Sequence, residues 1–374
     1  MQTEQLCWSP QTGWSPREAA LKPNLVLVFG SPSAMSRDGA FEELRRLYPD
    51  AHLVGCSTAG EIAGTHVMDD SLVATAVRFK KAHVEVARVN LRDGQSNEDL
   101  GAALATKLPK DGLAHVLVFS DGTHVNGSSL VKGMLAKLPA GVQVTGGLAG
   151  DGARFQQTFV MADARAADRS VTAIGFYGAD LHIGYGSLGG WDSFGPIRMV
   201  TKSKGNVLYE LDGQPALTLY KRYLGEHAAA LPAAGLLFPL NITSNGGPSL
   251  TRTILAVDEA AQTMTFAGDI PQGSRAQLMK ANFDRLVDGA HGAAEQSRDL
   301  LGAGAELAIL ISCVGRKLVL KQRVEEELEA VQDVLGPKAL LAGFYSYGEI
   351  CPAAPRANCE LHNQTMTITT LRET

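Results

Sequence analysis

The sequence has no excess of basic residues and no dense run of them. Among its 374 residues, 34 are Lys or Arg and 39 are Asp or Glu, which gives a net charge of −5. We therefore expect no nucleic-acid-binding surface. Long apolar segments are also missing: runs such as Leu307–Val314 suit buried strands and are too short to cross a membrane. Residues 1–16 lack a basic start followed by an apolar segment, so we expect no signal peptide.

Cysteine is scarce. The five cysteines include no CxxC pair, and an odd number in a chain of this length is not typical of a disulfide framework. We expect free thiols, a cytoplasmic location and no structural zinc site. Cys56 and Cys313, on or beside predicted strands, are expected to be buried, whereas a redox pair of Cys351 and Cys359 stays open as an alternative.

Several motifs of nucleotide-binding proteins and hydrolases are missing. No GK[ST] follows the glycine turns at Gly55–Gly60 and Gly146–Gly152, and Gly184–Gly190 lacks the third glycine of a dinucleotide-binding loop. The segment "SDGTHVNGSS" carries Ser, Asp and His near the end of a predicted strand but has no GxSxG elbow. We therefore expect that the chain is not an enzyme. The alternative is an enzyme of unknown reaction that uses Asp121, His124 or Cys351.

What the sequence does contain is one module used three times. In each unit an apolar strand is followed by a helix, a second strand and a glycine turn. The units run from "NLVLVFGS" to "AHLVGCSTAGEI", from "HVLVFSDG" to "VQVTGGLAGDG", and from "LAILISCVGR" to "ALLAGFYSYGEI". A further strand-like segment follows each turn. We predict an α/β fold with mixed (α+β) sheets, organised in two domains built from these strand–helix–strand–Gly turn–strand modules.

A glycine-rich stretch separates the second unit from the third. Residues 184–225 are interrupted by glycines and by Pro196, and Pro215 stands near the first turn of a predicted helix. We place a domain boundary at this helix, at about residue 220.

Five motifs together resemble the FIST sensory domain family. They are "GCSTAGEI", "GGLAGDG", "GWDSFGP", "NVLYELDGQPALTLYKRYLG" and "GFYSYGEI". The resemblance implies an N-terminal extension (1–23), a FIST N-terminal domain (24–220) and a FIST C-terminal domain (221–374). It also implies a ligand-sensing input module in signal transduction. Because the motifs extend from about residue 24 to the end of the chain, we expect no attached output domain.

Within that family, a stand-alone chain is similar to the nitric-oxide-sensing haem proteins of the NosP group. This resemblance implies a non-covalent haem b, nitric oxide as the signal, and a separate histidine kinase, diguanylate cyclase or phosphodiesterase as the partner. A homodimer is also open. His182 is our first choice for the iron ligand and His124 our second, with His227 and His291 behind them. The apolar slot beside His182 is expected from Ile183, Tyr185, Leu188, Trp191 and Phe194.

The alternative ligand is an amino acid or another small metabolite, without haem. Glu61, Asp151 and Glu349 would hold an amino acid, although Glu61 and Glu349 also suit a structural role as caps of their turns. In the third glycine turn, "GFYSYGEI", aromatic residues replace the small ones of the first turn, and we expect this turn to form a wall of the pocket. The predicted ligand-binding residues are Gly55, Glu61, Gly147, Asp151, Trp191, Phe344, Tyr345, Tyr347 and Glu349.

Overall fold

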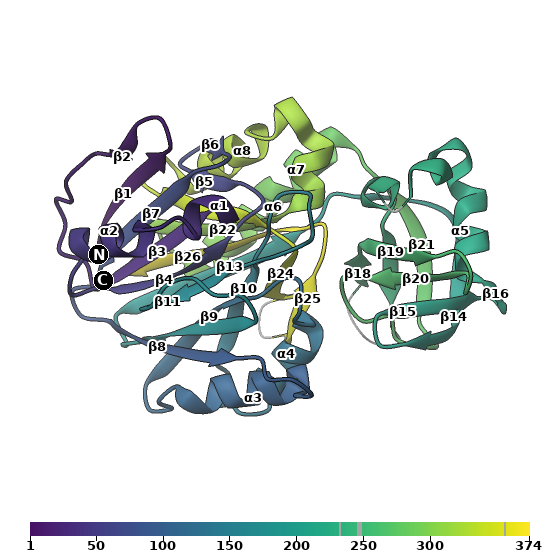
Figure 1. Ribbon diagram of the computed structural model, residues 1–374, viewed down its shortest axis with the longest axis horizontal. Helices are drawn as coiled ribbons and strands as arrows, with labels where there is room; N and C mark the ends of the chain where they lie inside the picture. Colours follow the sequence, from purple (N-terminus) through teal and green to yellow (C-terminus); the bar gives the residue numbers. More distant parts are fainter. Residues whose placement is uncertain (232, 245–248, 355–356) are drawn as a thin grey trace.

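The computed structural model describes residues 1–231, 233–244, 249–354 and 357–374. It consists of a large α/β body and a smaller domain rich in strands, which stands to one side of it (Figure 1). The chain leaves the body after β13 (Leu181–Leu188) and returns to it at α6 (Phe283–Leu301). The predicted α/β class with mixed sheets is confirmed. Among the described helices, none combines the length and the apolar character that crossing a bilayer requires.

The body contains three six-stranded sheets of equivalent order. The first contains β11 (Val160–Ala162), β4 (His52–Ser57), β3 (Leu25–Gly30), β7 (Leu72–Arg78), β1 (Gln2–Ser9) and β2 (Gly13–Ser15). The second contains β25 (Cys359–His362), β24 (Gly348–Pro352), β10 (Gln143–Leu148), β9 (Leu113–Ser120), β12 (Ser170–Tyr177) and β8 (His83–Asn90). The third contains β13, β26 (Met366–Glu373), β22 (Leu307–Cys313), β23 (Leu340–Ser346), β5 (Glu61–Ala63) and β6 (His66–Met68). Each sheet therefore has a central parallel pair and an antiparallel return strand, as the repeated module predicts.

The strand that follows each glycine turn does not stay in its own sheet. β5 of the first unit pairs with β23, β24 of the third pairs with β10, and β11 of the second pairs with β4. We call these three strands the arms. The second strand of each unit carries a glycine, Gly55, Gly146 or Gly343, where an added Cβ would lie within 2 Å of the carbonyl oxygen of the parallel neighbour. Close approach of these strands therefore requires glycine at the point where the arm of another unit pairs.

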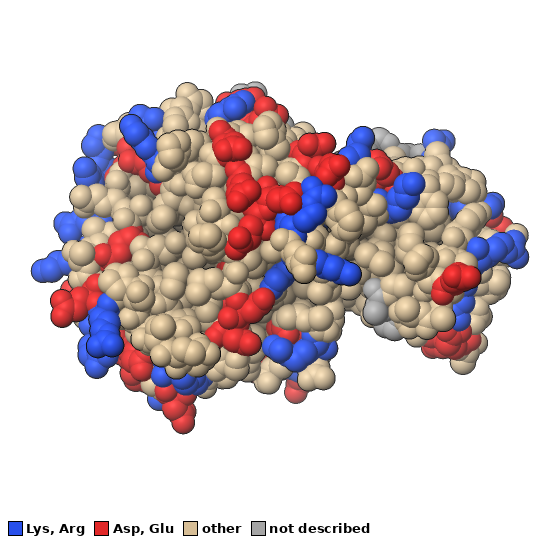
Figure 2. Space-filling model, turned by 90° about the horizontal axis from the view of Figure 1, so that it is seen from above, with Lys and Arg blue, Asp and Glu red and all other residues tan. Residues whose placement is uncertain are grey.

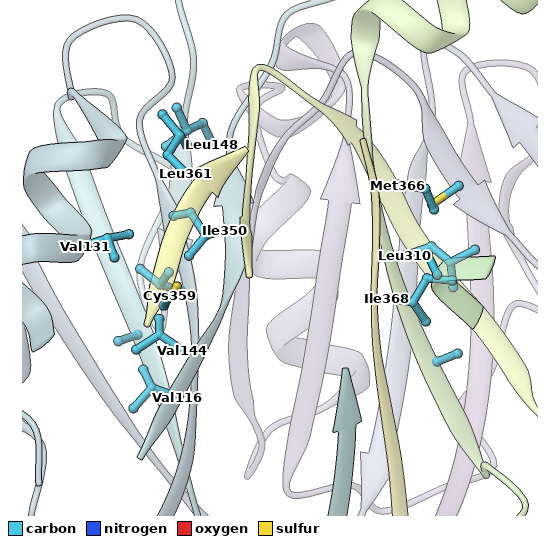
Figure 3. Packing of buried hydrophobic residues seen from close by; sticks show 14 of the residues in the cluster. Val116, Val131, Val144, Leu148, Leu310, Ile350, Cys359, Leu361, Met366 and Ile368 are labelled. Carbon is cyan, nitrogen blue, oxygen red and sulfur yellow. The ribbon is translucent and has the colours of Figure 1, made fainter. Parts of the chain in front are cut away.

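Helices cover the outer faces of the sheets. α1 (Pro32–Met35) and α2 (Ala40–Leu47) pack on the first sheet, and α3 (Asn97–Lys107) and α4 (Gly127–Leu135) on the second. The third sheet is covered by α6, α7 (Val314–Leu320), η3 (Lys321–Arg323) and α8 (Glu326–Leu335). Figure 3 shows how the arm β24, with β25 paired to it, joins the second sheet: Ile350, Cys359 and Leu361 face Val131 of α4 and the valines of β9 and β10. Between the sheets, Phe29, Phe119 and Phe344 form an aromatic centre, with ring centroids 4.8–5.9 Å apart.

The inserted domain has its own core. It contains β14 (Asp192–Lys204), β15 (Val207–Leu211), β16 (Gln214–Pro215), α5 (Ala216–Leu224), β17 (Leu240–Thr243), β18 (Ser249–Arg252), β19 (Ile254–Asp258), β20 (Thr263–Phe266) and β21 (Arg275–Lys280), with the short helices η1 (Gly225–Ala230) and η2 (Ala233–Leu237). Leu208 and Met264 pack with Tyr220 of α5 in one cluster. The boundary expected at about residue 220 thus falls inside α5, and residues on both sides of it share this core.

Two equivalent glutamates hold the turns at which the arms begin. Glu61 is 1% exposed and accepts hydrogen bonds from Thr58 Oγ1 and from Ser71 Oγ at 2.6 Å. Glu349 is fully buried and accepts from Ser346 Oγ at 2.7 Å and Thr365 Oγ1 at 2.9 Å. Burial raises the pKa of Glu61 to about 7 and that of Glu349 to about 8, although these hydrogen bonds favour the ionised form. Both side chains therefore have the structural role that the sequence offered as the alternative to ligand binding.

A buried ion pair connects the helices of the third unit. Arg316 of α7 and Glu327 of α8 are both 0% exposed, and Arg316 Nη2 lies 2.8 Å from Glu327 Oε2. Glu327 Oε1 accepts from Tyr345 OH at 2.6 Å, and Arg316 Nη2 also donates to Leu286 O of α6 at 2.6 Å. Arg316 and Glu327 thus form hydrogen bonds to each other, to α6 and to β23. These bonds hold α6, α7 and α8 against β23.

Removing one partner of this pair should destabilise the body strongly. Glu327→Ala leaves a buried guanidinium without its acid, and we expect the free energy of unfolding in urea to fall by about 3–5 kcal/mol. Glu326→Ala is the matched control, because Glu326 pairs with Arg323 at the surface and should change stability little. Equal effects of the two substitutions would contradict this account.

The raised pKa of Glu349 predicts a pH dependence of stability. A carboxyl that keeps its proton longer in the folded state stabilises the fold most below its unfolded pKa and loses that contribution as the pH rises toward the folded value. Between about pH 5 and pH 8, Glu349 should lower the free energy of unfolding by about 1 kcal/mol per pH unit. Glu349→Gln cannot ionise and should flatten this slope in urea titrations, whereas Glu329→Gln on the exposed face of α8 should not. Identical slopes for all three proteins would refute the prediction.

Candidate ligand-binding cleft

Two adjoining cavities lie between the body and the inserted domain. One has a volume of about 220 Å³ and the other of about 600 Å³, and Gly122, Thr123, Phe155 and Leu255 line both. The larger is in the usual size range of ligand sites. Figure 2 shows the two lobes of the molecule with a narrower waist between them, and no broad basic patch on the visible face. The two cavities together are called the cleft below.

The body contributes the carboxyl end of its parallel strands to the cleft. The loop after β9 carries Gly122–Asn126, and Leu148 ends the neighbouring β10. In open α/β sheets, ligands bind at this end of the strands. The inserted domain supplies the opposite wall, which includes Asn206 and is otherwise apolar: Leu231, Leu236, Ile254, Leu255, Phe266 and Ala267.

His124 is the imidazole that faces the cleft. Its Nδ1 lies 3.3 Å from Asp121 Oδ2 and 3.0 Å from Thr123 Oγ1, and its side chain is 38% exposed. Asp121 is fully buried; burial opposes its ionisation, but backbone N–H donors of His124, Arg169 and Thr123 prevail and hold its pKa below the usual range. The carboxylate thus orients the ring through Nδ1, and no hydrogen bond to Nε2 is found within the described residues. This is the arrangement that iron- and zinc-binding histidines commonly have.

Tyr347 and Phe155 form the aromatic wall. Their ring centroids are 4.2 Å apart with an interplanar angle of 15°, and Phe155 is 39% exposed. Tyr347 OH bonds to the Asp151 carboxylate and accepts from Phe155 N at 3.1 Å. Burial, and then the hydrogen bond to Asp151, raise the pKa of Tyr347. Asp151 also accepts from the backbone N–H of residues 155–157, so it shapes the loop that presents Phe155.

Most other predicted ligand residues lie inside the body. Gly55 and Gly147 are buried in β4 and β10, and Phe344 belongs to the aromatic centre. Tyr345 is buried against Glu327, and Trp191 donates from Nε1 to Gln364 O at 2.8 Å. Of the predicted set, the structure brings Tyr347 and His124 to the cleft, with Asp121 and Asp151 behind them. Phe155, Arg154 and Leu255 were not predicted, because they lie in polar or edge segments where a single apolar or basic residue has no periodic signal.

The surroundings of His182 do not fit a haem. His182 is exposed on β13 opposite Arg372, and its Nε2 lies 3.3 Å from Thr374 Oγ1. The glycines expected to leave room for a macrocycle are filled by α6 instead: a Cβ at Gly184 or Gly186 would lie 2.1 Å from a helix carbonyl oxygen. Leu188 points to solvent at 39% exposure, whereas Trp191 is buried. His227 and His291 are exposed, and His291 Nδ1 lies 3.6 Å from Glu295.

The cysteines offer no reactive pair. All five are free. Cys359 lies opposite Pro352 and Cys351 opposite Glu360, so the two side chains point to opposite faces of the β24–β25 pair. Burial raises the pKa of both thiols, and exchange needs an accessible thiolate. The alternative of a redox pair is therefore not favoured.

Comparison with a solved structure corrects one expectation. The fold can be aligned with that of a cyanuric acid hydrolase from A. caulinodans over 100% of this chain and 98% of the other, with 8% sequence identity and a TM-score of 0.39. That protein is an enzyme, and the expectation that this chain is not an enzyme is not retained. A likeness of this strength says nothing about a reaction or a site.

Sequence comparisons place the chain in a family. The MJ1623 protein of Methanocaldococcus jannaschii is 25% identical over 352 residues; the match covers 86% of this chain, which spans 65% of that protein's length. The model of the FIST N domain matches residues 24–214, and the model of the FIST C domain matches residues 216–352. The resemblance read from the glycine turns is thereby confirmed, while the narrower resemblance to nitric-oxide sensors stays a prediction. The chain belongs to the FIST family, whose domains are sensory domains of signal transduction proteins.

Proposed function

We propose that this chain senses a small molecule that binds in the cleft. The observation that carries the proposal is that both lobes line the cleft, with His124 and Phe155 from the body facing Leu255 and Ile254 from the inserted domain. A ligand held there contacts both lobes at once. It therefore stabilises the arrangement in which they are close, and the signal is a shift of population toward that arrangement.

Haem b held by His124 is the ligand that we propose first. His124, the second-choice histidine, has an oriented ring, an Nε2 without a partner among the described residues, and the apolar neighbours that a haem needs, whereas the surroundings of His182 do not offer this combination. Arg154 lines the larger cavity, with its Nε 4.0 Å from Asp151 Oδ2, and would supply positive charge for the carboxylate groups of a haem. When bound, a haem would supply an iron atom that takes nitric oxide. The chain's own part is to orient the imidazole through Asp121 and to exclude water with Phe155, Leu236 and Leu255.

The partner that would receive the signal is proposed from the resemblance to haem-binding members of the family. By analogy with haem members of the family, we propose that the arrangement of the two lobes is read by a separate histidine kinase or a cyclic-di-GMP enzyme. An amino acid held by Glu61, Asp151 and Glu349 is not carried further, because each of these carboxylates is buried and engaged within its own turn or loop.

Titration of the purified protein with haemin tests this assignment. The wild type is expected to give a shifted Soret band with one haem per chain, and His124→Ala should weaken binding by about tenfold or more, because the axial bond is lost. His182→Ala and His291→Ala are matched controls that remove exposed imidazoles and should leave the spectrum unchanged. No Soret shift with wild type, or an unchanged spectrum with His124→Ala, would overturn the haem assignment.

The cleft itself can be tested separately from haem. Leu255→Arg places a charged side chain in the cavity from a position that is already 40% exposed, so folding should be preserved. Any metabolite that raises the thermal midpoint of the wild type by binding in the cleft should lose its effect on this variant. Ile197→Arg, at an exposed apolar position on β14, is the control. An equal response of wild type and Leu255→Arg would place the ligand elsewhere.

A further inference from the structure

A third cavity lies at the same interface, apart from the cleft. Its volume is about 410 Å³, and it lies between α4, β25 and the inserted domain. The lining side chains used in the argument below are Ser128, Arg252, Asp269 and Glu360. None of them lines the cleft.

The main feature of this cavity is a buried guanidinium without an acid. Arg252 is 3% exposed, and its Nε donates to Asp269 O at 3.0 Å while Nη1 donates to Leu361 O at 2.9 Å. Nη1 also donates to Thr251 O at 3.3 Å, and all three acceptors are backbone carbonyls. Among the described residues, no carboxylate lies within 4.0 Å of this side chain and no acceptor is found for Nη2. Gly268 makes room for the group, because a Cβ there would lie 2.9 Å from Arg252 Nε.

Burying a charge without a counter-ion is unfavourable. Here it lowers the pKa of Arg252 to about 10, although Glu360 and Asp269 partly oppose the shift. The wall of the cavity also includes Ser128, whose Oγ is buried and unpaired in the described structure. Ser128 belongs to the first turn of α4, where backbone N–H groups and the helix dipole favour negative charge. Three features of different origin thus favour an anion at one place.

We propose that this cavity binds a small oxyanion, a carboxylate or a phosphate, through Nη2 of Arg252 and the hydroxyl of Ser128. Planar N–H donors of a guanidinium match the oxygens of such groups. Asp269 and Glu360 line the same cavity, so they limit the negative charge that a bound anion can carry. Asp269 Oδ1 already accepts from Asn126 Nδ2 at 3.1 Å, and burial raises the pKa of Glu360, which favours its neutral form beside a bound anion. The site therefore suits a single negative charge better than a double one.

The position of the site suggests that the anion strengthens the contact between the lobes. Arg252 comes from β18 of the inserted domain, and Ser128 comes from α4 of the body. Asn126 lines the cleft, while its partner Asp269 lines the anion cavity, so one hydrogen bond separates the two sites. An anion here would favour the same close arrangement of lobes, whatever binds in the cleft. The inference does not depend on haem.

Thermal unfolding in phosphate tests the proposal. At constant ionic strength, sodium phosphate should raise the midpoint of the wild type relative to sodium chloride, and the shift should grow with concentration. The same measurement in sodium acetate distinguishes the two kinds of anion. A response to acetate alone identifies a carboxylate site, and a response to phosphate alone identifies a phosphate site. If neither anion exceeds chloride, the proposal is wrong.

Three variants locate the effect. Ser128→Ala should weaken the apparent affinity for the effective anion by about tenfold, since it removes one hydrogen bond to a charged group. Arg252→Lys keeps the charge but loses the planar pair of donors, so it should weaken the apparent affinity for the anion at least as much as Ser128→Ala does. Ser187→Ala removes another buried, unpaired hydroxyl, on β13 outside this cavity, and should leave the response unchanged. If Arg252→Lys fails to fold, Ser128→Ala decides: a response equal to that of wild type overturns the site.

Discussion

The exchange of arms among the three units is the constraint on which the rest of the structure depends. Each sheet is completed by a strand from another unit, so no unit can satisfy the backbone of its inner edge alone. The glycine turns are where the chain leaves one sheet for the next, and Glu61 and Glu349 fasten two of them. Glycines and carboxylates that would look functional in an isolated loop are therefore needed to close the body.

The cleft forms where the repeat is broken. At the second turn, Gly152 stands where the other two have Glu61 and Glu349, and the carboxylate is one residue earlier, at Asp151. Asp151 therefore does not hold the turn as the two glutamates do. Its carboxylate accepts hydrogen bonds from backbone N–H groups of the loop that carries Phe155. The third turn differs from the first at another position, where Tyr347 supplies an aromatic ring and the first unit has Ala59. Departures from the repeat, rather than the repeat itself, supply the surfaces available to a ligand.

The parts of the fold that are local in sequence could be predicted. Buried strands such as Leu25–Gly30 and Leu307–Cys313 are continuous apolar runs, and glycine turns end the units. The path of the arms and the insertion after β13 could not, because they depend on pairing between distant segments, as where β13 meets β26. The same limit affected the site. His182 and His124 both follow strand-like runs, but only the neighbouring strands determine that one ring faces solvent and the other a cleft.

The connection between the lobes explains how binding could be transmitted. The chain crosses to the inserted domain and back on two adjacent strands, since Asp192 of β14 lies opposite Lys280 of β21. Arg285 and Asn282 of the body both bind Asp192 there, at 3.2 and 3.3 Å. Because both crossings lie side by side, we expect that any relative motion of the lobes would be a rotation about this connection. The proposed ligand in the cleft and the proposed anion near Arg252 would each contact both lobes, so each would oppose a rotation of one lobe against the other.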